Sequence, residues 1–232
     1  MAKSGRYNRH DRFYEKAKAD KYVARSVYKL DELDRRYGLI KKNQTIVDLG
    51  CAPGSWLQYL AEKVGRKGAV VGYDIVPVEM GFGPRVVAHV ADVKTLTPTR
   101  ILEDLAELTT KPVDALISDM APKLTGIRDA DQAKSVEMVG YGLRLAQALL
   151  QPDRGVFVAK LFQGRDTDGL VEDVRKAFRE VKLLKPEATR DGSREVFVLG
   201  RNLRREGRMD PAEWEPVEDA PEESGGRGDD GS

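Results

Sequence analysis

Three ionisable side chains stand at the borders of short apolar runs, where a parallel sheet presents side chains to a ligand. They are Asp119 after the run 114–118, Lys160 at the end of the run 155–160, and Glu195 at the start of the run 195–200. In an open α/β sheet, ligands bind beyond the carboxyl ends of the strands. If the last run forms an antiparallel strand, its first residue lies at that same edge. We therefore expect all three side chains in one crevice.

Two lysines and two carboxylates in such a crevice can handle a proton. A ribose 2′-hydroxyl is a poor nucleophile because its pKa is far above neutral, so it needs a nearby base. Partial burial and a second cation lower the pKa of a lysine, whereas carboxylates raise it and fix its position. Lys160 is the candidate base or positioning group, and Lys29, inside a predicted amphipathic helix, is a second cation that periodicity alone does not place. Singly, each residue is typical of a surface ion pair; together they favour an active site.

A glycine-containing loop follows the first predicted strand of the sheet and opens a helix. It reads Val-Asp-Leu-Gly-Cys-Ala-Pro-Gly-Ser-Trp over residues 47–56. Gly50 and Gly54 allow a tight turn and a close approach of the backbone to a ligand. Asp74 ends the next predicted strand, 24 residues after Gly50, where a carboxylate can accept both hydrogen bonds of a ribose diol.

The details of this loop favour S-adenosylmethionine over a dinucleotide. The loop is not G-x-G-x-x-G, and Pro53 removes an N–H that a pyrophosphate would use. Asp48 would repel a pyrophosphate but can help to hold the cationic methionine end, and Asp92, after the third strand, can reach an adenine amino group. The alternatives are a purely structural turn and a dinucleotide-dependent oxidoreductase.

The elements that must position these groups alternate along the chain. Short apolar runs, several of them continuous rather than alternating, predict strands covered on both faces. Predicted strands are 45–49, 69–73, 85–90, 114–118, 155–160, 181–184 and 195–200, and predicted helices are 26–37, 55–64, 99–109, 130–150 and 167–178. This order predicts an α/β fold with a seven-stranded, mainly parallel sheet, helices on both faces, and a last strand that runs antiparallel to its neighbour.

Charge is unevenly distributed, although the chain has 39 Lys and Arg against 38 Asp and Glu. Residues 1–29 carry nine basic and three acidic side chains (9 − 3 = +6), and residues 206–232 carry two basic and ten acidic ones (2 − 10 = −8). Aromatic residues interleave the basic segment, which suits phosphate contact and base stacking as well as it suits a solvated terminus. The acidic segment lacks the apolar residues needed to fold, so we expect disorder there.

Composition excludes several classes of protein. With 232 residues the chain is long enough to bury a core, and no apolar run approaches the roughly 18 residues of a membrane helix. We expect no signal peptide, because no apolar stretch follows the basic N-terminus. Cys51 has no internal disulfide partner, and one cysteine with two separated histidines predicts no metal site. We therefore expect a cytoplasmic protein without membrane contact.

Five motifs in order resemble the FtsJ family of S-adenosylmethionine-dependent ribosomal RNA 2′-O-methyltransferases. They are residues 25–33 (RSVYKLDEL), 48–56 (DLGCAPGSW), 118–122 (SDMAP), 158–164 (VAKLFQG) and 193–197 (SREVF). The resemblance implies a class I methyltransferase fold and methylation of a uridine ribose in 23S rRNA. It places the family's Lys-Asp-Lys-Glu tetrad on Lys29, Asp119, Lys160 and Glu195, and its cofactor residues on Gly54, Trp56, Asp74, Asp92 and Asp119.

Charge and the resemblance together divide the chain into three parts. They are a basic arm over residues 1–24, a methyltransferase domain over 25–203, which the resemblance implies, and an acidic tail over 204–232, which has no counterpart in the family. We expect a monomer that acts on rRNA of the large (50S) ribosomal subunit. Ser55 stands where the family commonly has glycine, and Lys123 stands where it commonly has asparagine. A tRNA 2′-O-methyltransferase on the same scaffold and an inactive RNA-binding protein are the remaining alternatives.

Overall fold

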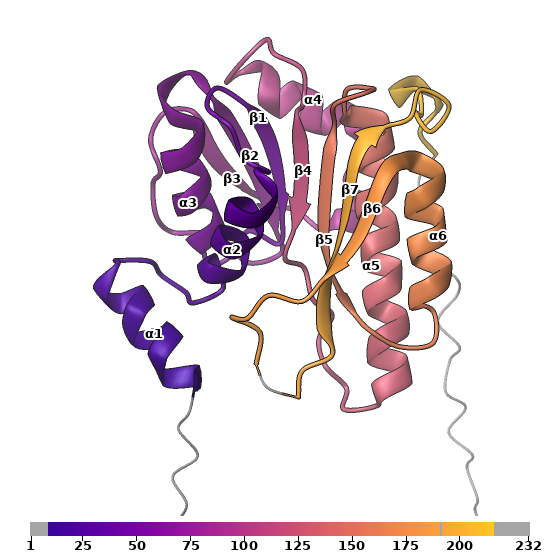
Figure 1. Ribbon diagram of the computed structural model, residues 1–232. Coiled ribbons are helices and arrows are strands. Elements are labelled where there is room, and N and C mark those ends of the chain that lie inside the picture. The colour runs from indigo at the N-terminus through magenta and orange to yellow at the C-terminus, as the bar shows by residue number, and fades with distance from the viewer. Residues whose placement is uncertain (1–8, 191, 216–232) are drawn as a thin grey trace, which may run out of the picture.

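One seven-stranded sheet forms the centre of the computed structural model, which describes residues 9–190 and 192–215 (Figure 1). The strand order is β3-β2-β1-β4-β5-β7-β6. The strands are β1 (Thr45–Leu49), β2 (Ala69–Asp74), β3 (Val86–Val90), β4 (Ala115–Ser118), β5 (Val156–Phe162), β6 (Phe178–Leu184) and β7 (Glu195–Leu203).

Strand directions follow the expectation from the sequence. The strands β1 to β5 pair in parallel, and β7 pairs antiparallel with both β5 and β6. Consecutive strands run outward from β1 to β3, and the chain then returns to β4 on the other side of β1. A reversal of this kind leaves a crevice at the carboxyl ends of the two central strands. The predicted fold class is therefore confirmed, and β1 and β4 border the crevice.

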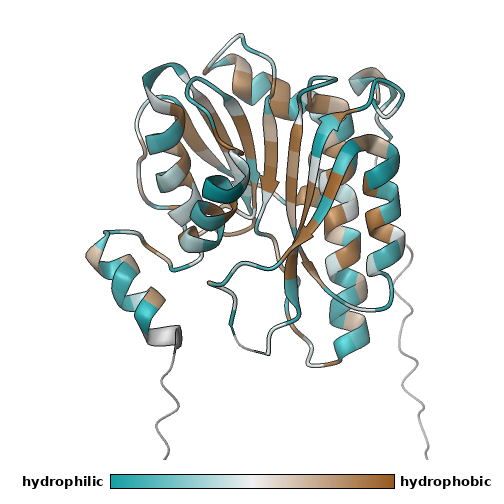
Figure 2. Ribbon diagram, viewed as in Figure 1, coloured by the Kyte–Doolittle hydropathy of each residue, from teal (hydrophilic) through white to brown (hydrophobic). Residues whose placement is uncertain are grey.

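Helices cover both faces of the sheet, as Figures 1 and 2 show. They are α1 (Arg9–Ala19), α2 (Val27–Tyr37), α3 (Ser55–Val64), α4 (Pro98–Ala106), α5 (Arg128–Leu149), α6 (Thr167–Ala177) and the short 3₁₀ turns η1 (Gly65–Lys67), η2 (Val93–Thr95) and η3 (Pro211–Glu213). None of the described helices is long and apolar enough to cross a membrane.

Alternation along the strands divides the core into two layers. Ile46 packs with α2 and α3 on one face, whereas the neighbouring Val47 packs with α4 and α5 on the other. The same alternation along β5 places Val158 with α2 and α3, and Ala159 with α5 and α6. Lys160, the next residue, therefore belongs to the face that α2 covers.

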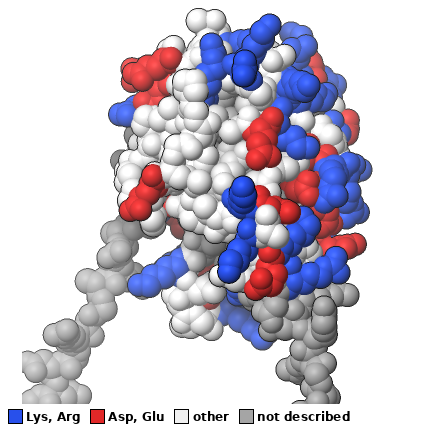
Figure 3. All heavy atoms as spheres, turned by 90° about the vertical axis from the view of Figure 1, so that its left-hand side faces the viewer, with Lys and Arg blue, Asp and Glu red and all other residues white. Residues whose placement is uncertain are grey.

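Helix α1 lies within the predicted basic arm and was not predicted as a helix. Phe13 and Ala17, one helical turn apart, turn toward α2: the ring centroids of Phe13 and Tyr28 are 5.7 Å apart, and Ala17 is buried. Its remaining residues are strongly polar, with four basic and two acidic side chains (4 − 2 = +2). Figure 3 shows Lys and Arg interspersed with Asp and Glu over the side of the molecule that carries α1 and α3. Residues 1–8 of the arm lie outside the described residues.

The predicted acidic tail is ordered in its first part. Met209 N donates to the Gln147 carbonyl over 3.1 Å, and the Arg144 guanidinium lies 4.6 Å from the centre of the Trp214 ring. Residues 204–215 thus pack against α5, so the expectation of disorder from residue 204 is wrong for this stretch. Trp214 is the reason, since it is a large apolar side chain among acidic residues. Residues 216–232 lie outside the described part.

Candidate active site

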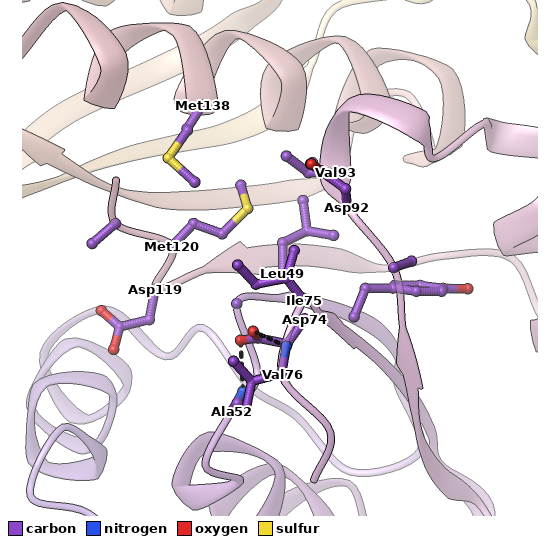
Figure 4. Close-up of a pocket in the computed structure, with 14 residues that line it drawn as sticks. Leu49, Ala52, Asp74, Ile75, Val76, Asp92, Val93, Asp119, Met120 and Met138 are labelled. Atoms are coloured by element: carbon purple, nitrogen blue, oxygen red, sulfur yellow. Dashed lines mark hydrogen bonds between the residues drawn. The ribbon is translucent and has the colours of Figure 1, made fainter. Parts of the chain in front are cut away.

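A cavity of about 260 Å³ opens at the carboxyl ends of β1, β2 and β4, where the strand order reverses. Figure 4 shows Asp74, Asp92 and Asp119 at three different strand ends around the cavity, with Met120 and Met138 between Asp119 and Asp92. The lining residues are Leu49, Gly50, Ala52, Tyr73, Asp74, Ile75, Val76, Ala91, Asp92, Val93, Asp119, Met120, Ala121 and Met138. The wall is thus mostly apolar, with three carboxylates at its rim.

Asp74 is held rigidly by the backbone around it. One carboxylate oxygen accepts a hydrogen bond from Ala52 N and the other from Val76 N, each over 2.9 Å. These bonds tie the glycine loop after β1 to the turn after β2 (Figure 4). Because a carboxylate offers about four lone-pair sites, Asp74 retains acceptor capacity for a ligand diol. Ile75 and Val76, beside it, are 69% and 53% exposed and can cover a flat ring.

Asp92 caps the short turn that follows β3. Its Oδ1 accepts a hydrogen bond from Lys94 N over 3.0 Å, which sets the carboxyl group at the N-terminus of η2. The side chain lines the cavity beside Val93. Its remaining lone pairs suit an amino or hydroxyl donor, and the contact of Asp92 with an adenine amino group stays a prediction.

The two loop glycines serve close packing in different places. A Cβ atom at Gly50 would lie 2.7 Å from Met120 N, so this glycine lets the β1 and β4 loops approach at the cavity. A Cβ at Gly54 would lie 2.8 Å from a ring carbon of Phe82, and Gly54 has φ +108°. Gly54 is not a lining residue of the described cavity. Its predicted contact with a cofactor therefore stays a prediction.

Trp56 lies in the core rather than at the cavity. Its ring is 2% exposed and stacks on Phe197 with centroids 6.1 Å apart. Its Nε1 donates to the Ser26 carbonyl over 3.0 Å, and the hydroxyls of Ser26 and Ser55 are 2.9 Å apart. These contacts join the start of α3 to the start of α2, which carries Lys29. Trp56 and Ser55 thus position a predicted catalytic residue, and the predicted contact of Trp56 with a cofactor stays untested.

Asp48 is buried completely below the glycine loop. Neither carboxylate oxygen has a hydrogen-bond partner among the described residues, and the side chain is not part of the cavity wall. Burial raises the pKa of Asp48 well above its usual range, and the charges of Asp119 and Asp74 add to this shift. A carboxyl group with a raised pKa favours its neutral form. This arrangement therefore argues against the predicted role of Asp48 as a charged partner of a cationic ligand.

Lys160 and Asp119 form a largely buried ion pair at the edge of the cavity. Lys160 Nζ donates to Asp119 Oδ1 over 2.9 Å and also to the backbone carbonyl of Asp119. The two side chains are 9% and 15% exposed. Asp119 also lines the cavity. One carboxylate therefore connects the candidate cofactor pocket to the lysine that was predicted to handle a proton.

Lys29 and Glu195 form a second pair on the same face of the sheet. The distance between Lys29 Nζ and Glu195 Oε1 is 2.5 Å, and the side chains are 12% and 13% exposed. In the β5–β7 ladder Lys160 pairs with Phe197, and Glu195 lies two residues before Phe197. Glu195 is therefore a diagonal neighbour of Lys160 on the face covered by α2. The structure brings all four predicted residues to one edge of one face, including Lys29, which periodicity did not place.

The apolar wall of the cavity was missed by the sequence analysis. Tyr73, Val93, Met120 and Met138 line it, and each is of a residue type that ordinarily fills a core. Met138 comes from the middle of α5, which passes over the crevice only because of the tertiary packing. The sequence positions next to Asp74 and Asp119 could have predicted part of this wall. Residues that neighbour a ligand-binding carboxylate at a strand end lie at the same edge of the sheet.

Comparison with known proteins agrees with the topology. The model of the FtsJ-like methyltransferases matches residues 22–203. The chain belongs to this family. It is 43% identical over 202 residues to the ribosomal RNA large subunit methyltransferase E of Myxococcus xanthus (85% of this chain, 91% of the relative), and 42% identical over 199 residues to the protein of that name from Syntrophobacter fumaroxidans (86% and 98%).

A solved structure shares the fold. A protein assigned as a ribosomal RNA methyltransferase in Plasmodium falciparum superposes with a TM-score of 0.68 at 27% sequence identity, covering 78% of this chain and 98% of that one. The segment matched by the FtsJ-like family model contains the cavity and both ion pairs. The proposed tetrad thus lies wholly inside the part of the chain that defines its family.

The cavity suits the adenosyl group that FtsJ-like methyltransferases imply. Asp74 and Asp92 offer acceptors to hydroxyl and amino donors, and the apolar wall between them offers a surface to a purine ring. The third carboxylate, Asp119, stands at the end of the cavity that leads to Lys160. These carboxylates accept hydrogen bonds and carry negative charge, so the cavity suits a nucleoside better than a pyrophosphate.

Proposed function

We propose that this protein transfers a methyl group from S-adenosylmethionine to the 2′-hydroxyl of a uridine ribose in 23S rRNA of the large ribosomal subunit. The observation that carries the proposal is the position of Asp119, which lines the cavity and holds Lys160 through a 2.9 Å hydrogen bond. Membership of the FtsJ-like family and the names of the relatives support the reaction and the substrate.

Asp74, Asp92 and the apolar wall would hold the cofactor, with Asp119 next to its reactive end. When bound, S-adenosylmethionine supplies a methyl group on a positively charged sulfur, which is already an activated electrophile. The protein must then present a ribose oxygen beside Asp119 and remove its proton. Holding two reacting groups in line supplies much of the rate acceleration in such a reaction.

Lys160, as the neutral amine left after its ammonium group has released a proton to solvent, orients the ribose hydroxyl and accepts its proton. Two hydrogen bonds from Lys160 Nζ, to the side chain and to the backbone carbonyl of Asp119, fix the position of the amine. The amine can therefore contact the ribose hydroxyl from one side only. Glu195 holds Lys29 on the same face of the sheet. The four side chains thus work as two coupled pairs, with Lys160 closest to the reaction.

The substrate is the assembled 50S subunit, and the protein acts on it as a monomer in the cytoplasm. The experiment that tests the proposal incubates the protein and tritiated S-adenosylmethionine with 50S subunits from cells that lack it. Labelled rRNA is then digested to nucleosides for mass spectrometry. The expected product is one 2′-O-methyluridine in 23S rRNA. Label on a base, or label accepted by tRNA and not by 50S subunits, would overturn the proposal.

A further inference from the structure

Two aliphatic side chains stand exposed on the loop between β4 and α5. Leu124 and Ile127 are each 66% exposed, and neither packs into the two core clusters. The loop, residues 121–127, begins two residues after Asp119. Exposure of aliphatic side chains to water is unfavourable, and burial against another molecule would lower the free energy. The placement of both side chains on one ordered loop therefore points to a contact with another molecule.

The loop is held in one shape from beneath. The carboxylate of Asp131, which is 4% exposed, accepts hydrogen bonds from Thr125 N and Thr125 Oγ1, each over 2.7 Å, and from Gly126 N over 3.2 Å. Gly126 has φ +84°, a conformation that favours glycine. These bonds present Leu124 and Ile127 outward on a fixed turn. A fixed turn loses little conformational entropy when it binds a partner.

Both ends of the loop are attached to the candidate active site. Its first residue, Ala121, lines the cavity together with Met120 and Asp119. At the other end, Arg194 donates a hydrogen bond to the Arg128 carbonyl over 3.3 Å, and Arg194 directly precedes Glu195. The loop therefore joins the end of the cavity to the carboxylate that holds Lys29. When the reactive group of a substrate lies at Lys160, the neighbouring parts of that substrate would contact this loop.

The charges on the loop indicate the chemistry of that molecule. Lys123 on the loop and Arg128, the first residue of α5, are exposed and flank the two aliphatic side chains, and the exposed Asp129 follows Arg128. Cations next to apolar side chains suit a polyanion that also has flat, apolar faces. Its phosphates can pair with the cations, and its bases can pack against the aliphatic side chains. An RNA strand has this composition.

We propose that Leu124 and Ile127 pack against bases next to the target uridine and so hold its ribose at Lys160. The proposal rests on the proposed function and adds a substrate-positioning element to it. Phosphates on either side of these bases are contacted by Lys123 and Arg128. When the target nucleotide turns toward the cavity, its neighbouring bases lose a stacking partner, and the aliphatic pair packs against the base faces that are exposed.

A kinetic test uses the double variant Leu124→Ala, Ile127→Ala. We expect kcat/KM for methylation of 50S subunits to fall at least tenfold, while the affinity for S-adenosylmethionine by calorimetry stays within twofold of the wild type. Leu102→Ala, at a 42% exposed leucine on α4, is the matched control and should leave both values unchanged. A double variant as active as the wild type would overturn the inference. A wild type that methylates no RNA would instead overturn the proposed function.

Site-directed crosslinking identifies the partner. Cys51 is the chain's single cysteine and is 2% exposed, so a thiol-reactive benzophenone on Leu124→Cys labels one chosen place. Irradiation with 50S subunits should attach this protein to 23S rRNA within a few nucleotides of the methylated uridine, whereas Leu102→Cys should give no crosslink there. Crosslinks of the Leu124→Cys protein to a ribosomal protein alone, or to rRNA far from the uridine, would overturn the inference.

Discussion

Asp119 belongs both to the cavity wall and to the ion pair with Lys160. Its side chain lines the cavity, and its Oδ1 and backbone carbonyl both accept hydrogen bonds from Lys160. Replacing it would therefore disturb the cofactor pocket and the proton-handling lysine together. Asp74 and Lys160 separate these effects, because each belongs to one arrangement alone in the described structure.

The first prediction concerns Asp74. Asp74→Ala should raise the dissociation constant for S-adenosylmethionine at least tenfold, about 1.4 kcal/mol, because the variant loses a ligand acceptor and frees Ala52 N and Val76 N. Isothermal calorimetry measures the affinity. Asp173→Ala, which removes an exposed ion pair with Lys176 on α6, is the control. Equal affinity of Asp74→Ala and wild type would exclude the assigned role.

Residue-level prediction succeeded where the backbone decides the position of a side chain. Asp119, Lys160 and Glu195 were placed together because strand ends at one edge of a sheet must meet there. Lys29 was not placed, since the packing of α2 on the sheet decides which way its side chain points. Asp48 looked like a ligand because it also stands near a strand end. Its position on the face beneath α2 and α3 buries it instead.

The second prediction follows from the buried Asp48. Because its pKa is raised in the folded protein, the folded state binds more protons than the unfolded state above pH 3.8, and stability falls as pH rises toward the folded pKa. The slope is up to about 1.4 kcal/mol per pH unit for one proton. Asp48→Asn should remove this slope, so its stability relative to wild type in urea unfolding should be greater at pH 8 than at pH 5. The same difference at both pH values would contradict this account.

At the scale of elements, local patterns predicted strands well and the surface helix α1 poorly. Short apolar runs, several of them continuous, predicted all seven strands, and the order of the runs predicted the fold class. The observed β6 begins at Phe178 rather than Val181, because the charged, exposed Arg179 and Glu180 interrupt the apolar pattern and belong to the strand through its pairing with β7. Helix α1 has Phe13 and Ala17 as its contacts with the core, too few for a clear helical period.

The third prediction concerns the loop between β4 and α5. Asp131→Ala removes the acceptor of three hydrogen bonds, so the amides of Thr125 and Gly126 should exchange with solvent at least tenfold faster. Methylation should weaken, because a mobile loop holds RNA less well. Hydrogen–deuterium exchange with mass spectrometry reports both loop amides. Asp129→Ala, at an exposed position in the same helical turn, is the control, and unchanged exchange in Asp131→Ala would show that the carboxylate does not order the loop.

At the scale of the whole molecule, the segment 204–215 extends the folded unit beyond the matched family region. Arg144 donates to the Glu215 carbonyl over 2.7 Å, and Gln147 donates to the Gly207 carbonyl over 2.9 Å. These bonds tie the segment to α5, on the face of the sheet opposite α2. The segment therefore supports the helix that supplies Met138 to the cavity.

The fourth prediction tests this support. Trp214→Ala should lower the free energy of unfolding by about 1–2 kcal/mol, from lost apolar burial and the lost contact with Arg144. A chain ending at residue 215 should keep wild-type stability, whereas one ending at residue 203 should lose more than Trp214→Ala does. Chemical denaturation measures all three. Equal stability of the two truncated chains would show that residues 204–215 contribute nothing to the fold.

The most direct measurement compares methyl transfer and cofactor affinity in Lys160→Ala. Tritiated methyl transfer to 50S subunits should fall at least a thousandfold, while calorimetry finds an affinity for S-adenosylmethionine within threefold of the wild type, since Lys160 does not line the cavity. Lys160→Arg should also be inactive, because a guanidinium stays protonated and accepts no proton. Wild-type turnover in Lys160→Ala would contradict the account.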